Sequence, residues 1–282
     1  MEAIKEYKVL ARKYRPQKFE DLVGQDSLVQ ILKGAITNDR LAHAYVLTGV
    51  RGVGKTTTAR LIAMSINCQK RSKDNCEPCG DCDSCKSTGV DSNLDVIEMD
   101  AASNTGVDDI REIIDNVKYK PIIGKYKIFI IDEVHMLSKS AFNALLKTLE
   151  EPPEHVKFIF ATTEVKKIPI TVLSRCQRFD LLRIENNNLT KHLLKVVELE
   201  NIDIDNDAIS LIVRAADGSI RDGLSLLDQA ITNQNIKIDS KAISTMLGLA
   251  EREKIFDLIE KILEGNSFEA LALYKKLYDL GA

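Results

Sequence analysis

The chain has 282 residues, 44% hydrophobic and 29% charged, with a formal net charge of −3. This composition excludes an intrinsically disordered chain, and the length predicts two or three globular domains. No apolar run approaches membrane-spanning length and the N-terminus is charged rather than signal-like, so a cytoplasmic location is expected. The net charge also excludes a polycation, so any contact with nucleic acid must depend on a local basic surface.

The first 40 residues predict an arm followed by a helix. Residues 7–23 are basic and aromatic and are interrupted by Pro16, which favours an extended arm over a core strand. Asp26 is expected to cap the helix that follows. Its apolar residues recur at helical spacing: Leu28, Ile31, Leu32, Ala35 and Ile36.

A phosphate-binding loop is predicted next. The apolar run 44–47 suits a buried strand, residues 49–56 (GVRGVGKT) fit G-x-x-x-x-G-K-[ST], and residues 57–66 suit a helix. In such a loop, backbone N–H groups and a helix N-terminus surround a polyphosphate, Lys55 reaches the β and γ phosphates, and the Thr56 hydroxyl binds Mg²⁺. The alternative, an ordinary glycine-rich turn, is disfavoured by this context. The predicted nucleotide contacts are Gly49, Val50, Arg51, Gly52, Val53, Gly54, Lys55, Thr56 and Thr57.

A cysteine cluster follows the P-loop helix, at Cys68, Cys76, Cys79, Cys82 and Cys85. Because a reducing cytosol argues against disulfides, four thiolates at short spacing predict a structural tetrahedral Zn²⁺ site. An iron–sulfur cluster is the runner-up. Spacing alone leaves open which four of the five cysteines bind the metal.

The region from 94 to 182 alternates strands and helices. Strands are predicted at 94–99, 126–131, 156–161 and 177–182. Helices are predicted from a Ser103 cap through Val117, from Ser138 or Ser140 to the stop at Pro152, and over 168–174. This alternation predicts a parallel sheet with helices on both faces.

Two carboxylates, Asp132 and Glu133, follow the apolar strand 128–131 as in a Walker B element. Parallel strands place their carboxyl ends at one sheet edge, so this pair is expected to meet the P-loop. Asp132 is predicted to bind Mg²⁺ and Glu133 to orient the attacking water. A threonine at the end of the next strand, Thr162 or Thr163, is a candidate phosphate contact. The four histidines show no catalytic spacing, so none receives a role.

The remainder of the chain predicts helices only. Asn186 to Asn188 is expected to be a linker, followed by three helices within 189–231 and further helical pattern from 237 to 278. The expected division is 1–184 (core, with the cysteine module at 68–85), 185–236 (three-helix domain) and 237–282 (part of a third domain).

Several of these segments together closely resemble the gamma/tau subunits of bacterial DNA polymerase III, the ATPases of the replicative clamp loader. They are GVRGVGKTTTAR, DAASNTGVDDIRE, IDEVHMLSKSAFNALLKTLEEPPEHVKFIFATTE, LSRCQRF and GSIRDGLSLLDQ. The resemblance covers residues 7 to 282 and implies an AAA+ fold with a helical lid, then a helical collar that joins subunits into a pentameric spiral.

The resemblance also implies roles for individual residues. Thr163 is implied as a nucleotide sensor, Arg221 as the lid arginine at the γ-phosphate, and Arg175 as a finger acting on a neighbouring subunit's ATP. The implied zinc ligands are Cys68, Cys79, Cys82 and Cys85, which leaves Cys76 as a departure. Arg12, Tyr14 and Arg15 are implied to line the adenine side of the pocket.

The function implied is Mg²⁺-dependent ATP hydrolysis that loads a sliding clamp onto primer-template DNA, in a hetero-pentamer with other clamp-loader subunits. A C-terminal tail, where present, would add contacts to the replicative polymerase and helicase. One alternative is another AAA+ motor such as a branch-migration helicase, which the cysteine insertion and the Ser174-Arg175-Cys176 motif disfavour. The other is a non-catalytic assembly subunit, which the intact Lys55, Asp132 and Glu133 disfavour.

Overall fold

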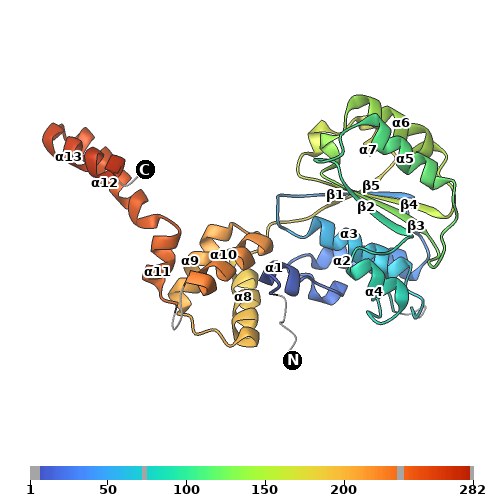
Figure 1. Ribbon diagram of the computed structural model, residues 1–282, viewed down its shortest axis with the longest axis horizontal. Coiled ribbons are helices and arrows are strands. Elements are labelled where there is room, and N and C mark those ends of the chain that lie inside the picture. Colours follow the sequence, from blue (N-terminus) through green and yellow to red (C-terminus); the bar gives the residue numbers. More distant parts are fainter. Residues whose placement is uncertain (1–6, 72–74, 234–237, 280–282) are drawn as a thin grey trace. The chain divides into compact units, whose positions relative to one another are not determined.

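The computed structural model describes residues 7–71, 75–233 and 238–279 (Figure 1). It divides into two compact units: the larger contains residues 11–188 and 218–221, and the smaller contains 7–10, 189–217 and the described residues from 222 onward. Within this described part, no helix combines the length and apolar character needed to cross a membrane.

The larger unit is built on a five-stranded parallel sheet with the strand order β2-β3-β4-β1-β5. Every residue of the central strands β1 and β4 is buried, as expected for strands covered on both faces. The strands are β1 (Ala44–Thr48), β2 (Val96–Asp100), β3 (Lys127–Asp132), β4 (Val156–Thr162) and β5 (Gln177–Asp180).

Helices cover both faces of this sheet and create two apolar cores (Figure 1). On one face, α2 (Asp26–Thr37) and α3 (Lys55–Ile66) pack against alternate strand residues such as Tyr45 and Ile130. On the other face, α5 (Val107–Val117), α6 (Lys139–Glu150) and α7 (Ile170–Leu173) pack against residues such as Val46 and Phe129. The alternation of strand residues between the two cores gives the expected three-layer α/β arrangement. Short elements complete this unit: α1 (Leu10–Lys13, which begins in the smaller unit), the 3₁₀ turns η1 (Phe19–Asp21), η2 (Val134–Met136) and η3 (Val165–Lys167), and α4 (Asp83–Gly89).

Several predicted boundaries were wrong, and hydrogen bonds account for those at Gln25 and Gly106. The N-terminal arm (residues 7–23) contains the helical turns α1 and η1 rather than being extended throughout. Gln25, not Asp26, precedes α2, and its buried side chain bonds the backbone of Leu182 instead of the helix end. The expected cap Ser103 lies in a turn, because α5 begins only after Gly106, whose N–H donates to Asp109 at 3.1 Å. Ser138 does cap α6, accepting from Ala141 N at 3.2 Å.

Strand ends also differ from the prediction. Strand β2 begins at Val96 rather than Leu94, because Asn93 and Asp95 form a turn there. Asp95 is almost fully buried, and its carboxylate accepts three backbone N–H bonds from residues 122–124. These bonds hold the segment that leads into β3.

The smaller unit is helical. The expected linker Asn186 to Asn188 instead forms the first turn of α8. An isolated bridge joins Ile204 to Ile238, and α11 packs against α9. The helices are α8 (Asn186–Glu200, whose first turn belongs to the larger unit), α9 (Asn206–Ala216), α10 (Ile220–Asn233, which begins in the larger unit), α11 (Ser240–Met246), α12 (Leu249–Leu263) and α13 (Ser267–Asp279).

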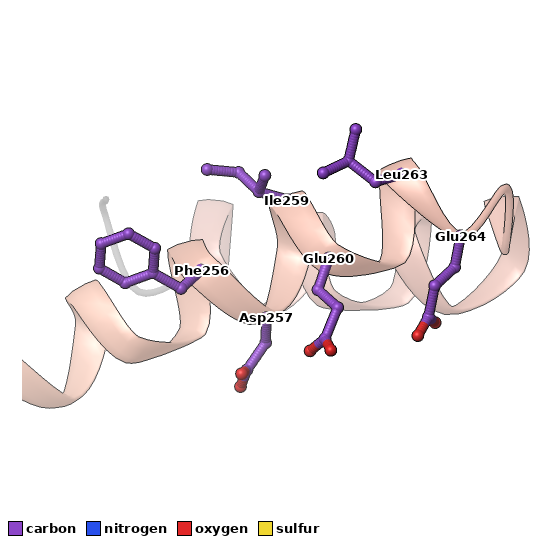
Figure 2. A pocket seen from close by; sticks show the side chains of 6 residues that line it. All are labelled: Phe256, Asp257, Ile259, Glu260, Leu263 and Glu264. Atoms are coloured by element: carbon purple, nitrogen blue, oxygen red, sulfur yellow. The ribbon is translucent and has the colours of Figure 1, made fainter.

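Helix α12 carries an open depression on its surface. Six side chains of α12 line this depression, and Figure 2 shows that they fall into two groups along the helix. Three are apolar (Phe256, Ile259 and Leu263) and three are acidic (Asp257, Glu260 and Glu264). Phe256 and Leu263 are strongly exposed. This depression belongs to the smaller unit, whereas the P-loop belongs to the larger one.

Candidate nucleotide-binding site

The P-loop connects the end of β1 to the start of α3, in a conformation that only glycine adopts easily. Gly52 and Gly54 have φ angles of 79° and 101°, in the left-handed region. A Cβ at Gly52 would also lie 1.9 Å from the Ser219 hydroxyl oxygen. The missing side chain at Gly52 therefore serves both the turn and the close approach of the segment before α10.

Lys55 is held within this loop. Only 6% of the residue is exposed, and its Nζ donates to the carbonyl oxygens of Gly49 at 3.0 Å and Val50 at 2.9 Å. Burial lowers the pKa of Lys55, and the nearby carboxylates of Glu133 and Asp132 partly oppose that shift. A buried cation at a helix N-terminus is suited to bind an anion.

The predicted meeting of the P-loop and the acidic strand end is present. Strands β1 and β3 both pair with β4 in parallel, so their carboxyl ends lie at the same sheet edge. There the Thr56 hydroxyl donates to Oδ2 of Asp132 at 2.5 Å. A hydroxyl and a carboxylate at this distance are oxygen donors of the kind that Mg²⁺ prefers.

Glu133 directly follows β3 with a left-handed backbone, at φ 44° and ψ 43°. Its Oε2 accepts from both the backbone N–H and the hydroxyl of Thr163, at 3.2 and 3.1 Å. Left-handed non-glycine residues are concentrated at functional sites. The structure thus brings the predicted water-orienting carboxylate and the predicted sensor threonine into contact.

His135 also belongs to this cluster, although no sequence pattern selected it. Its Nδ1 lies 3.3 Å from Oε2 of Glu133 and 3.0 Å from the Thr162 hydroxyl. Histidine spacing along the chain carried no signal. The only available signal was its position three residues after Asp132, at a strand end.

The two predicted arginines lie at opposite ends of the parallel strands, Arg221 beside the carboxyl ends and Arg175 beside the amino ends. Arg221, at the start of α10, donates its backbone N–H to Gly52 O at 3.4 Å, beside the P-loop. Arg175 precedes the amino end of β5, and its guanidinium pairs with Glu150 and the Thr171 carbonyl, both at 2.5 Å. The amino ends of the strands lie opposite the P-loop edge, so Arg175 is remote from the site of its own chain.

The three predicted arm residues are not brought together with the P-loop by the contacts described. Arg12 is exposed, and its carbonyl accepts from Arg15 N at 3.5 Å. Arg15 is partly buried, and burial together with the charge of Arg60 lowers its pKa. Arg60 itself pairs with Asp91 and Glu98 at 2.6 and 2.7 Å. Tyr14 lies under the Lys13 ammonium, 5.5 Å from its ring centre.

Four cysteines form a separate cluster beside α3. The sulfur atoms of Cys68, Cys79, Cys82 and Cys85 all lie within 4.8 Å of one another, and the Cys79–Cys85 pair is 4.0 Å apart. Tetrahedral zinc with Zn–S bonds of about 2.3 Å places its sulfurs about 3.8 Å apart. Cys76 is outside this group, buried in the core with α2 and α3.

The backbone around Cys79 also suits a thiolate. Its sulfur accepts N–H bonds from Cys82 at 3.3 Å and Asp81 at 3.4 Å. Burial raises the pKa of the Cys79 thiol, but these N–H donors and the neighbouring cysteines outweigh burial and lower it to about 6. The donor set therefore fits a thiolate-bound metal of the zinc type.

Comparisons with known proteins decide the family. Residues 24–185 match the family described as DNA polymerase III, delta subunit, residues 188–244 match the DNA polymerase III clamp loader subunit ATPase lid domain, and residues 238–282 match domain III of DNA polymerase III subunits gamma and tau. A DNA polymerase III subunit gamma of Buchnera aphidicola (subsp. Acyrthosiphon pisum) is 45% identical over 98% of this chain and 76% of its own length. The chain belongs to the gamma/tau family of DNA polymerase III.

Longer members of the gamma/tau family match equally well. The tau subunit of Escherichia coli is 46% identical over 95% of this chain and 41% of its own length, and that of Bacillus subtilis is 46% identical over 98% and 48%. The chain thus spans less than half the length of these tau relatives.

The chain also shares its fold with a motor protein of known structure. The Holliday junction branch migration motor RuvB of Thermotoga maritima superposes with a TM-score of 0.61 and 17% identity, over 88% of this chain and 80% of that one. This likeness confirms the predicted α/β fold, and the family match over residues 188–244 confirms the helical ATPase lid that follows it.

Proposed function

We propose that this gamma/tau chain is an ATPase motor subunit of the clamp loader. It uses ATP binding and hydrolysis to load the sliding clamp onto primer-template DNA during replication. The observation that carries the proposal is the contact between Thr56 and Asp132 at one sheet edge, beside a buried Lys55, in a chain of this family. These groups are of the kind that bind a nucleoside triphosphate together with Mg²⁺.

Each group at this edge has a proposed role. P-loop residues 49–57 cradle the phosphates, Lys55 neutralises them, and Thr56 and Asp132 hold Mg²⁺. The bound cation would neutralise charge that develops on the transferred phosphoryl group. Glu133 orients and polarises the attacking water, and its contact with Thr163 supports a sensor role for that threonine.

Arg221 is proposed to contact the γ-phosphate from the lid, which its position beside Gly52 supports. Arg175 is proposed to act on the ATP of a neighbouring subunit. Its place at the opposite sheet edge supports action in trans, because it is remote from the P-loop of its own chain. Hydrolysis would then require assembly.

Further parts of the proposal follow the family. Zn²⁺ is proposed to bind Cys68, Cys79, Cys82 and Cys85 in a structural role, since four thiolates leave no open coordination position. Arg12, Tyr14 and Arg15 are proposed to line the adenine side of the pocket. The domain division proposed is a core, a lid and the beginning of a collar.

Partners are also proposed from the family. They are the other clamp-loader subunits, the sliding clamp and primer-template DNA, in the cytoplasm. DNA contact is proposed through backbone phosphates, and the affinity should therefore fall steeply with salt. Contacts with the polymerase and helicase would belong to a C-terminal tail.

A branch-migration motor is the rival that the fold alone would allow. Sequence identity disfavours it, being 17% to RuvB and 45% to a gamma subunit. A non-catalytic subunit is the second rival, which the assembled Thr56–Asp132 and Glu133–Thr163 contacts disfavour.

One experiment separates these possibilities. We would measure the ATPase rate of the full-length protein, reconstituted with its partner subunits, with and without clamp and primed DNA. Stimulation by clamp and primed DNA, lost in Glu133→Gln, is expected. A rate indifferent to the clamp but stimulated by branched DNA would favour the branch-migration motor, and no turnover would favour the non-catalytic subunit.

A further inference from the structure

His135 lies immediately behind the proposed catalytic carboxylate. It belongs to the 3₁₀ turn η2, and only 7% of its side chain is exposed. One ring nitrogen, Nδ1, lies 3.3 Å from Glu133 Oε2 and 3.0 Å from Thr162 Oγ1. The other, Nε2, lies 3.5 Å from Glu164 Oε1. The imidazole is therefore enclosed by polar groups from the ends of two neighbouring strands.

The chemistry of these neighbours indicates the direction of the hydrogen bond. An ionised carboxylate only accepts hydrogen bonds, so a bare Nδ1 beside Glu133 would oppose two lone pairs. The Thr162 hydroxyl accepts a bond from Glu164 N at 2.9 Å and keeps a second lone pair that can accept a bond from Nδ1. A proton on Nδ1 that points between Thr162 and Glu133 fits this arrangement. Nε2 is then the bare nitrogen, and the carboxylate oxygen nearest to it, Glu164 Oε1, lies 3.5 Å away and accepts instead from Lys167 Nζ at 2.8 Å.

The orientation of the Glu133 side chain depends on these partners, because Glu133 lies beyond the end of β3 and no strand pairing constrains it. Its φ of 44° turns it away from the path of β3. The contacts described for its carboxylate come from Thr163 on one side and His135 on the other. If one is removed, the carboxylate can change rotamer.

We propose that His135 is a positioning residue for ATP hydrolysis: its Nδ1–H fixes the orientation from which Glu133 aligns the attacking water. This inference rests on the proposed function. The contacts described for His135 are to Glu133, Thr162 and Glu164 and not to the P-loop, so its loss should lower kcat and leave the KM for ATP nearly unchanged. A misplacement of about 1 Å can reduce a rate by about 100-fold, which sets the expected loss.

Two substitutions separate positioning from packing. His135→Asn keeps an N–H donor near the place of Nδ1, whereas His135→Leu fills the space without a donor. We expect His135→Asn to retain most of kcat and His135→Leu to lose about 10- to 100-fold. The assay uses the full-length protein in the reconstituted complex, and binding of a fluorescent ATP analogue and the Tm are measured in parallel.

A double substitution supplies the second readout. In a Glu133→Gln background, His135→Leu should cause no further loss, because the two residues act as one unit. Wild-type kcat in His135→Leu would overturn the proposal, as would equal losses in His135→Asn and His135→Leu that follow their Tm. Absence of turnover in the wild-type complex would instead refute the proposed function itself, which keeps the two failures distinct.

Discussion

The Thr56 hydroxyl and the Asp132 carboxylate lie 2.5 Å apart, although 76 residues separate them in the chain. Their contact joins the first turn of α3 to the end of β3, across an edge formed by parallel strands. The proposed magnesium site depends on this contact.

Thr56→Val should abolish this site. Because it removes a metal-binding oxygen, we expect the ATPase rate of the reconstituted complex to fall at least about 10- to 100-fold, a loss that even second-sphere metal partners cause. Thr58→Val is the matched control on the same helix, since the Thr58 hydroxyl is buried without a hydrogen-bond partner. It should leave the rate unchanged and the stability equal or higher. Equal rates in both variants would contradict the magnesium role.

Glycine-to-alanine substitutions should change the free energy of unfolding in an order set by two factors: the φ angle of the glycine and the room for an added Cβ. Gly52→Ala combines a left-handed φ, which costs about 1 to 2 kcal/mol, with a collision against Ser219. Gly54→Ala carries only the backbone cost, because nothing lies within 4 Å of its Cβ. Gly34→Ala, at an exposed position of α2, should gain about 0.5 to 1 kcal/mol. Urea unfolding measures the order, and a Gly52→Ala protein as stable as Gly54→Ala would contradict it.

Lys55→Met should stabilise the nucleotide-free protein while abolishing ATP binding. Burial lowers the pKa of Lys55 below its ordinary value of 10.5, so the charged form destabilises the folded state at neutral pH. Between the lowered pKa and 10.5 the unfolded chain binds more protons, so wild-type stability should rise with pH there. Lys55→Met should lack this rise. The difference between the two pH curves isolates Lys55 from Lys157, whose pKa is also lowered by burial. A Lys55→Met protein that is less stable at pH 7 would contradict the assignment.

Cys79→Ser should release the proposed zinc. We expect metal content, measured by mass spectrometry, to fall from about one ion per chain to none, with a lower Tm, because four thiolates complete a structural site. Cys76→Ala is the control, since Cys76 lies in the core outside the four-sulfur group. If Cys76→Ala also loses the metal, the assigned ligand set is wrong.

Arg175→Ala should impair hydrolysis only after assembly. Arginines supplied in trans contribute about 10³- to 10⁵-fold in other phosphoryl-transfer systems, so a loss at the lower end of that range is expected in the complex. ATP binding by the isolated chain should not change. Arg178→Ala, which breaks an exposed pair with Asp180 at 2.7 Å, is the matched control. Weaker ATP binding by the isolated Arg175→Ala chain would argue against a role in trans.

The sequence allowed the larger elements of this site to be predicted because they rest on local patterns. The P-loop spacing, the apolar strands and the acidic pair after β3 are all contained in short segments. Parallel alternation then implied that Lys55 and Asp132 share an edge. The four-sulfur cluster could not be selected by spacing alone, because Cys76 continues the regular C-x₂-C spacing and Cys68 does not, yet packing places Cys76 in the core and Cys68 with the other three sulfurs.

Contacts between distant segments account for what the sequence did not reveal. Gln25 bonds Leu182 rather than its own helix, and His135 acquires its neighbours from the end of β4. Neither partner is near in the chain. The linker predicted at Asn186 to Asn188 was wrong for a different reason, since asparagine is common both in loops and at the N-termini of helices.

The separation of Arg175 from Lys55 by the full length of the strands gives each molecule two unlike rims. In the proposed mechanism, one rim would carry a nucleotide pocket that needs a cation from a neighbour, and the other rim would supply that cation through Arg175. Copies stacked head to tail would complete one another at every junction but the terminal ones. An open row of such copies would therefore always contain one pocket that no neighbour completes, so its turnover would depend on where the row ends.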